Sequence, residues 1–369
     1  MSSNESRYFF NRLLSAFLPA LAFFSLYTVA FVSGSSLGLT SEYSHPLWLR
    51  WDSFHYLSIA KQGYQAEACG SFVCGNTGWF PLYPLLIKLG SPFAAGSLEK
   101  SSIIVIFVTF MLLSFVLSKL VDNRWSPLGV SVALVILPGG IYRVSAFPIT
   151  IMLLFCMLCL FYLKQGKYLV ACIAAVLASL SYPSAILFAT CVLILLFDQR
   201  RLSMFQQYRW RGWLIAAFFP IGFLLSSLFI QSAAHIENAY ALTQARYGHS
   251  AGLGFETLRS SIKYFYKNPI FFQTFLVLLL LVLCVLVLAR SPLVRSGYSF
   301  GLLCFGCLVF FLTALAGDTV SAYRQESLIA PLFIFIGSYL PRYVLAVVSA
   351  PLVLSALMMA RLFFEGVLV

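Results

Sequence analysis

A succession of long apolar runs constrains the fold of this chain more than any other feature. A helix needs about 20 consecutive apolar residues to cross a bilayer. The runs cover residues 13–34, 101–118, 127–142, 147–163, 168–181, 184–197, 213–231, 270–289, 299–316, 327–340 and 343–360. We therefore predict an all-α polytopic membrane protein in which about 11 transmembrane helices form one domain over residues 1–369.

The composition excludes several other classes of protein. Hydrophobic residues make up 61% of the chain and charged residues only 10%, whereas a soluble domain carries about 25% charge. A water-soluble enzyme is therefore excluded. The 24 basic residues are scattered through apolar sequence, which also excludes intrinsic disorder and nucleic-acid binding.

Several apolar runs are shorter than a straight crossing needs, and prolines interrupt them. Pro138, Pro148 and Pro183 stand where helices are expected to break. Broken helices are tolerated in lipid only where protein or a water-filled cavity covers the freed backbone. We therefore expect residues 127–197 to pack around a cavity.

The distribution of charge predicts an orientation. With the N-terminus in the cytoplasm, the inner segments carry 13 basic and 3 acidic residues, and the outer segments carry 11 basic and 9 acidic. This excess of Lys and Arg inside favours that orientation. A bacterial plasma membrane is the favoured location, with the endoplasmic reticulum as the alternative.

Two outer segments, residues 35–100 and 231–269, are too long to be simple turns. They hold all four histidines and are rich in Trp and Tyr, so we expect them to be ordered. Residues 81–89 are apolar but too short to span, which predicts a helix in the membrane interface. Two cysteines of the first loop, Cys69 and Cys74, favour a local disulfide in an oxidising compartment, and the other seven lie in apolar spans.

The stretch from Trp48 to Tyr64 is the most informative part of the sequence. If it is helical from Asp52, then Asp52, His55 and Tyr56 share one face. One interpretation is an interfacial helix with Trp48, Trp51 and Tyr56 in the aromatic belt and Asp52 as its N-cap. The other is a functional site in which Asp52 is a half-buried base.

The functional interpretation gains support from a family resemblance. Arg50-Trp51-Asp52 is followed by His55, Ile59-Ala60, Gly63-Tyr64 and then Trp79-Phe80-Pro81-Leu82-Tyr83-Pro84. This pattern resembles the PIG-V family, the second mannosyltransferases of glycosylphosphatidylinositol assembly and their bacterial relatives. The likeness extends more weakly to 138–154, Gln244 and Arg324. The chain departs from the family at Phe147-Pro148-Ile149-Thr150, where an acidic residue is usual, and at Tyr182, where an Arg is common.

The resemblance implies a GT-C-type glycosyltransferase that takes a sugar, with mannose favoured, from a polyprenyl phosphate on the non-cytoplasmic side. The acceptor is a lipid-linked or other glycan, the mechanism is inverting, and neither metal nor cofactor is expected. Asp52 is the expected base, with His55 orienting it or binding the acceptor. Arg324 and Arg246 are expected to offset the charge of the leaving phosphate. Arg324 is expected about 10 Å from Asp52, with the sugar between them.

The remaining candidates are aromatic or polar side chains of the outer segments. Gln244, Tyr247 and Asp318 are candidates for hydrogen bonds to sugars, and Tyr56 is included because it shares the Asp52 face. Trp79 and Phe80 either stack on a sugar or anchor the loop. Two other functions stay open: a transporter or flippase of lipid-linked sugars, and a non-catalytic lipid-binding subunit of a glycan-assembly complex.

Overall fold

The structure, a computed structural model, describes residues 48–122, 124–197, 209–247, 256–290, 297–315 and 322–368. The first predicted span, residues 13–34, lies outside these ranges, as do His45, His249 and Asp318. Within them the chain is mostly helical, as predicted.

Four of the described helices are long and apolar enough to cross a membrane, judged by length and composition. They are α4 (Leu98–Leu120), α10 (Arg209–Ala234, from Trp213 on), α13 (Pro269–Arg290) and α17 (Arg342–Phe364). These four helices support an integral membrane protein. The predicted total of about 11 crossings stays a prediction, because the other apolar helices are shorter.

The three prolines interrupt the helices where the sequence predicted breaks. Helix α5 ends two residues before Pro138, α7 begins directly after Pro148, and Pro183 opens a 3₁₀ turn after α8. The elements of this region are α5 (Pro127–Ile136), α6 (Gly140–Val144), α7 (Ile149–Lys164), α8 (Tyr168–Ser181), η2 (Pro183–Leu187) and α9 (Phe188–Phe197).

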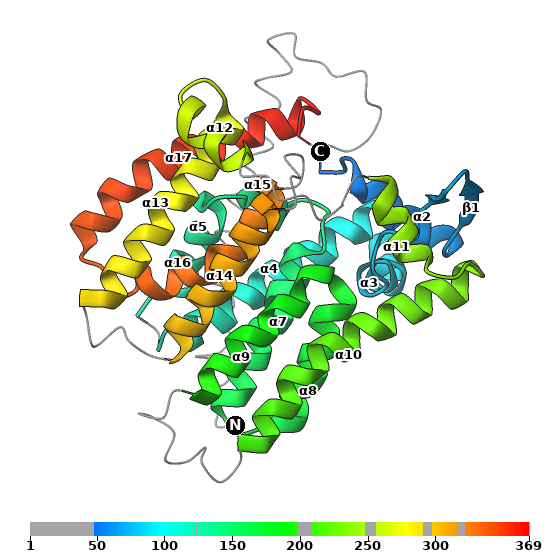
Figure 1. The fold of residues 1–369 in the computed structure, drawn as a ribbon, viewed down its shortest axis with the longest axis horizontal. Coiled ribbons are helices and arrows are strands. Elements are labelled where there is room, and N and C mark those ends of the chain that lie inside the picture. The colour runs from blue at the N-terminus through cyan, green and yellow to red at the C-terminus, as the bar shows by residue number, and fades with distance from the viewer. Residues whose placement is uncertain are drawn as a thin grey trace.

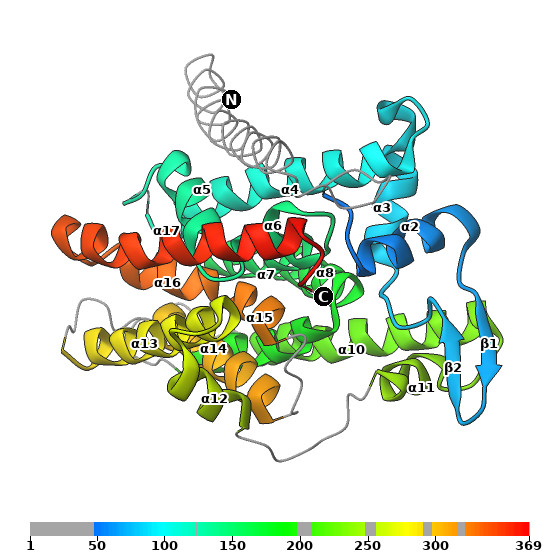
Figure 2. The ribbon, with the colours of Figure 1, turned by 90° about the horizontal axis from the view of Figure 1, so that it is seen from above.

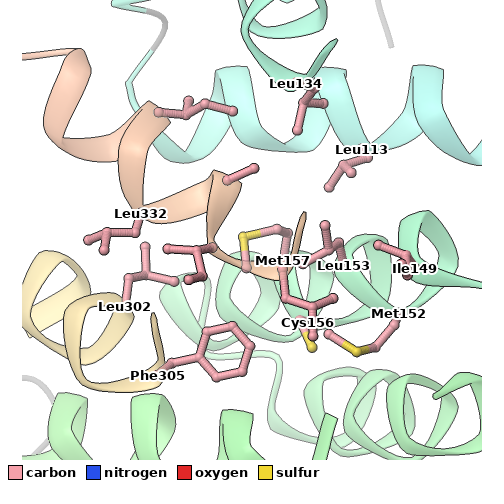
Figure 3. Packing of buried hydrophobic residues seen from close by; sticks show 14 of the residues in the cluster. Leu113, Leu134, Ile149, Met152, Leu153, Cys156, Met157, Leu302, Phe305 and Leu332 are labelled. Atoms are coloured by element: carbon pink, nitrogen blue, oxygen red, sulfur yellow. The ribbon is translucent and has the colours of Figure 1, made fainter. Parts of the chain in front are cut away.

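Most of residues 127–197 pack into the core, as the buried side chains of α7 show, whereas one face of α5 lines a cavity with α13, α16 (Ala330–Gly337) and α17. Figure 3 shows side chains of α7, among them Met152, Cys156 and Met157, between Leu113 and Leu134 on one side and Phe305 on the other. All of these residues are fully buried. The apolar side chains of α7 face neighbours around the helix, so packing with other helices covers the short span.

The C-terminal part of the chain adds another broken segment. It comprises α14 (Gly297–Leu315), α15 (Ala322–Gln325), η4 (Glu326–Ile329) and α16 (Ala330–Gly337) before α17. The second long outer segment is ordered over two helices, α11 (Ala239–Arg246) and α12 (Glu256–Tyr264).

The first long outer segment is not entirely helical, so the all-α prediction needs a small correction. It contains α2 (Asp52–Gln62), α3 (Leu82–Gly90) and η1 (Ser91–Ala94), and between α2 and α3 a two-stranded antiparallel hairpin of β1 (Ala66–Cys69) and β2 (Phe72–Gly75). Figures 1 and 2 place α2, α3, α11 and this hairpin together at one end of the bundle.

Candidate functional site

Helix α2 begins at Asp52, so Asp52, His55 and Tyr56 are on consecutive turns of one helix, as the sequence predicted. Asp52 is not the N-cap, which corrects one interpretation: Trp51 occupies that position, and its side chain makes no capping bond. Trp51 has a φ of 47°, which is unfavourable for a bulky residue. Strained backbone of this kind tends to occur at functional sites.

The segment before Asp52 is fixed against the turn between α6 and α7. The Ser53 hydroxyl donates to the carbonyl oxygen of Ala146 at 3.1 Å, and the Ala146 amide donates to the carbonyl of Trp48 at 3.2 Å. The guanidinium of Arg50 donates to the Phe364 carbonyl, at the end of α17, at 3.4 Å. Distant parts of the chain therefore hold the start of α2 in place.

The Asp52 carboxylate forms an ion pair with the guanidinium of Arg324. The side chain of Arg324 is 9% exposed and that of Asp52 is 21% exposed. Burial is the largest influence on the pKa of Arg324 and lowers it, but Asp52 and nearby tyrosines outweigh burial and raise the pKa above its usual value. The predicted separation of about 10 Å is wrong, because the two opposite charges, largely shielded from water, attract each other into direct contact.

Arg324 lies on α15, which is anchored by buried polar contacts. The side chain of Gln273 on α13 donates to the carbonyl of Tyr323 at 3.2 Å and to the carboxylate of Glu326 at 2.7 Å. Its own oxygen accepts from the Gly139 amide at 3.0 Å. Gln273 therefore fixes the residues on either side of Arg324.

A fully buried arginine secures the same region from the other side. Arg143 donates to the carbonyls of Leu134, Leu137, Pro138 and Ser327 at 2.5 to 3.0 Å. Leu134 lies in the last turn of α5, and Leu137 and Pro138 directly follow the helix, where carbonyl groups lack partners within it. Arg143 thereby joins the broken end of α5 to η4, directly after Arg324.

His55 lies against Trp79 with a ring-centroid distance of 3.6 Å and nearly parallel planes. The ring of Tyr247 packs edge-on against the same Trp79 indole, with a ring-centroid distance of 5.9 Å. Burial, the largest cause, lowers the pKa of His55; Arg246 lowers it further and Asp52 opposes the shift, but the net direction is down. His55 is therefore mostly neutral at pH 7, although Asp52 and Arg246 both act on it electrostatically.

Trp79 is positioned by hydrogen bonds from distant side chains to the backbone of its own loop. The Tyr64 hydroxyl donates to the Trp79 carbonyl at 2.8 Å, and the side-chain amide of Gln244 donates to the Gly78 carbonyl at 2.9 Å. Gln244 was expected to bind a sugar directly. In this structure its amide instead ties α11 to the loop that carries Trp79.

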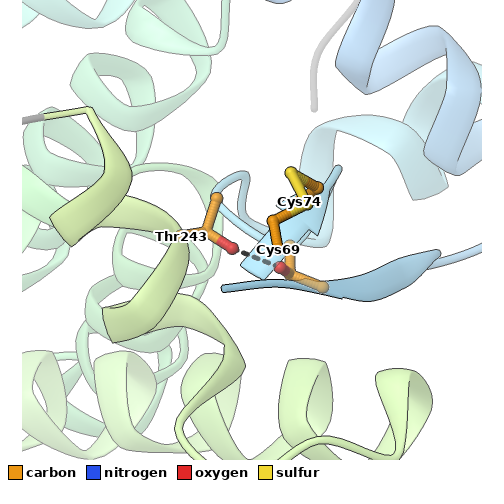
Figure 4. Close-up of a disulfide and its surroundings, with 4 residues drawn as sticks. Cys69, Cys74 and Thr243 are labelled. Carbon is orange, nitrogen blue, oxygen red and sulfur yellow. Dashed lines mark hydrogen bonds between the residues drawn. A yellow bond between two sulfur atoms is a disulfide. The ribbon is translucent and has the colours of Figure 1, made fainter. Parts of the chain in front are cut away.

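The structure contains the disulfide expected between Cys69 and Cys74, with Cα atoms 5.8 Å apart. It closes the β1–β2 hairpin beside Thr243 of α11 (Figure 4). The hydroxyls of Thr77 and Thr243 lie 2.6 Å apart and are buried. The hairpin, α11 and the Trp79 loop are thus joined into one unit.

The aromatic-belt interpretation fits only one of its three residues. Trp48 and Tyr56 are buried, whereas Trp51 is 38% exposed. Tyr56 packs edge-on against Tyr83 at 5.1 Å, inside the protein rather than at its surface. The Asp52 face of α2 therefore points into a protein site.

Two residues near Arg324, Phe147 and Tyr182, were not among the predicted site residues. The Arg324 guanidinium lies 5.8 Å from the ring centre of Phe147, which fits a cation–π contact. Tyr182 acts electrostatically on Arg324, and its hydroxyl accepts from the Gln325 amide at 3.0 Å. The sequence held one clue to their role, because Phe147 and Tyr182 directly precede the helix-breaking Pro148 and Pro183.

The other predicted residues are only partly placed. Arg246 is exposed at the end of α11, with its guanidinium 5.7 Å from the Tyr247 ring centre. Asp318 lies outside the described residues. Within the described ranges, no group of three or more His, Cys, Asp or Glu side chains is arranged to hold a metal ion.

No family model, curated protein or solved structure matched this chain.

Proposed function

We propose that this protein is an integral membrane glycosyltransferase. It moves a sugar, with mannose favoured, from a polyprenyl-phosphate donor to a lipid-linked or glycan acceptor on the non-cytoplasmic side. The observation that carries the proposal is the Asp52–Arg324 ion pair beside His55 and Trp79. The resemblance of residues 48–90 to the PIG-V family supports it independently.

The two charges match the two needs of this reaction. The acceptor hydroxyl is a poor nucleophile, and a carboxylate that takes its proton during attack makes it a better one. In the proposed step the acceptor oxygen bonds to the anomeric carbon and its proton passes to Asp52. The bond from that carbon to the phosphate oxygen breaks, and the electron pair leaves with the phosphate. A single attack inverts the anomeric centre.

Arg324 serves the leaving phosphate in this proposal. Arg presents a planar fork of donors that matches phosphate oxygens, and charge that develops on the leaving group is stabilised best by a fixed cation in a site shielded from water. Because Arg324 contacts Asp52 in the unliganded protein, donor binding exchanges the carboxylate for the phosphate. This exchange frees Asp52 to act as a base.

The aromatic surface beside the pair suits a sugar ring. Trp79 is buried beneath His55 and Tyr247, and these two rings, half-buried and exposed respectively, present aromatic surface that packs well against the apolar face of a sugar ring. The surrounding contacts of Tyr64 and Gln244 hold Trp79 still. A rigid wall next to the reacting groups keeps the sugar in the orientation that attack requires.

The direct test is transfer by the purified protein. It would be incubated with polyprenyl-phosphate mannose and membrane lipids, and the products analysed by mass spectrometry. A new glycosidic bond supports the proposal. A transporter would instead move the labelled lipid between leaflets of a vesicle without forming a bond, and a binding subunit would retain the donor unchanged. Either of those results rejects transferase activity.

A further inference from the structure

A cavity of about 160 Å³ lies between α5, α13, α16 and α17. Its walls include Trp125 and Gly129 near the start of α5, Gly337 at the end of α16, and Leu345 in the first turn of α17. The Asp52 site, in contrast, contacts the end of α17 and the segment before α16. The helices that line the cavity, α5, α13, α16 and α17, lie in the part of the bundle away from α2 and α3, as their ribbons in Figure 2 show.

The lining of this cavity is almost entirely hydrocarbon. Ser349 carries the only hydroxyl group among the lining side chains, and that hydroxyl already donates to the Ala346 carbonyl at 2.8 Å. Apart from the indole N–H of Trp125 and the thiol of Cys284, the lining side chains offer no unused polar group to a ligand. An occupant must be apolar where it contacts these walls, because an unpaired polar group would lose its hydrogen bonds to water.

The cavity is elongated along the helices. On α5 it is lined from Gly129 to Leu137, and eight residues of helix rise about 12 Å. The hydrocarbon core of a bilayer is about 30 Å thick, so this length matches most of one leaflet. Two of the walls, α13 and α17, are long and apolar enough to cross a membrane. An extended lipid tail has the required shape and chemistry.

Two cationic residues lie close to the lining residues Trp125 and Leu340 in the chain. Arg124 precedes the lining residue Trp125, and its guanidinium lies 4.2 Å from the ring centre of Tyr339. Arg342 begins α17, two residues after the lining residue Leu340. Both arginines are exposed.

The nearest described acidic residue in sequence, Asp122, is already paired with a lysine. Its carboxylate contacts Lys164 at 2.7 Å. The charge of Asp122 is thereby offset, and the two arginines are left to attract an anion. Basic residues beside pockets between membrane helices are suited to anionic lipid head groups.

We propose that this cavity binds one anionic phospholipid. A tail occupies the apolar cavity, and its phosphate lies at Arg124 and Arg342, in the leaflet opposite the Asp52 site. The site does not depend on the reaction proposed above, because it shares no residue with the Asp52–Arg324 pair. The occupant is a bilayer phospholipid rather than a polyprenyl-phosphate donor, whose phosphate is required at the other end of the bundle.

Lipid retention by the full-length protein in mild detergent tests this proposal. Native mass spectrometry would compare phosphatidylglycerol with phosphatidylcholine of identical tails, and each with polyprenyl phosphate. The charge-removing double variant Arg124→Gln/Arg342→Gln is expected to weaken binding of phosphatidylglycerol roughly 30-fold, since each basic residue near a lipid surface contributes about fivefold. Lys167→Gln is the matched control: it removes one charge from the turn between α7 and α8, away from the lining residues, and is expected to change binding less than about twofold.

A second measurement locates the tail without any variant. Phosphatidylglycerol with a photoreactive group in its acyl chain is expected to crosslink to α5, α13, α16 and α17 of the wild-type protein. Crosslinks confined to other helices would overturn the proposal. So would equal retention of phosphatidylcholine, or preferential capture of polyprenyl phosphate in this cavity. If the double variant fails to fold, the crosslink map and the lipid comparison on the wild type still decide the outcome.

Discussion

Asp52 and Arg324 are separated by 272 residues of sequence and form a direct ion pair at one end of the helix bundle. The backbone segment that carries each residue is fixed by contacts that do not involve the other residue of the pair. Ser53 fixes the start of α2 to the Ala146 carbonyl, and Gln273 donates to the carbonyl of Tyr323 and the carboxylate of Glu326, which flank Arg324 in the chain. The scaffold therefore assembles the pair, and in the proposed reaction a substrate separates its two charges.

The role of Asp52 as a base is tested by Asp52→Asn. The amide keeps the size of the side chain but cannot take the acceptor proton, so sugar transfer should fall by roughly 10²- to 10⁴-fold. Transfer would be measured by mass spectrometry of the lipid product. Glu67→Gln is the matched control, because Glu67 is an exposed acidic residue of the same outer segment. Near-normal transfer by Asp52→Asn would make Asp52 a structural residue.

The role of Arg324 is tested by comparing Arg324→Gln with Arg324→Lys. Loss of one cation that stabilises the leaving group should lower transfer about 10²- to 10³-fold. Lys restores charge but not the planar fork, so it should recover only part of the activity. Arg361→Gln, which removes an arginine from an exposed pair with Glu365, should transfer normally. Equal activity of the glutamine and lysine variants would argue against a charge-based role.

His55 predicts a dependence of stability on pH. Burial lowers the pKa of His55 in the folded protein. Below the ordinary histidine pKa of about 6.5, the imidazole therefore binds a proton more readily in the unfolded chain than in the folded protein. Stability should therefore fall as the pH drops from about 6.5 toward the lower folded pKa, and His55→Gln should lose this component. Unfolding midpoints in detergent at pH 7.5 and 5.5 would measure it. Parallel curves for wild type and variant would refute the assignment.

Arg246 offers a check on the same titration. It contributes to lowering the pKa of His55, so Arg246→Gln should move that pKa back toward its ordinary value. The loss of stability on acidification should then become smaller than in the wild type. A larger loss in the variant would contradict the electrostatic contact.

Arg143 is predicted to be essential for stability rather than chemistry. Arg143→Met removes the donor from four buried carbonyls, and the cost of leaving buried acceptors unpaired should be about 3 kcal/mol or more. Thermal unfolding in detergent would report the loss. Arg290→Met, at the exposed end of α13, should unfold like the wild type. A stable Arg143→Met protein would mean that water or neighbouring groups satisfy these carbonyls.

The disulfide tests the proposed orientation independently of catalysis. If residues 35–100 face an oxidising compartment, a membrane-impermeant thiol reagent on intact cells should label Cys69 and Cys74 only after a reductant is added. The seven free cysteines, four of them buried, serve as the internal background. Labelling that requires a broken membrane would place the loop in the cytoplasm and reverse the topology.

The sequence by itself determined the class of structure and the place of its interruptions. Apolar runs predicted helices because only internally bonded backbone is stable in lipid, and Pro138, Pro148 and Pro183 marked the breaks because proline cannot continue a helix. The start of α2 at Asp52 and the pairing of Cys69 with Cys74 were local features. Such features depend on neighbours within a few residues, which the sequence shows directly.

Only the tertiary structure decided how distant residues meet. The contact of Asp52 with Arg324, the burial of Tyr56 and the use of Gln244 as a tie to Gly78 all depend on segments far apart in the chain. The hairpin at 66–75 was missed because its short strands carry no clear alternation of apolar and polar residues. Hydropathy gives the order of helices along the chain, but the packing of side chains sets which of their ends share a site.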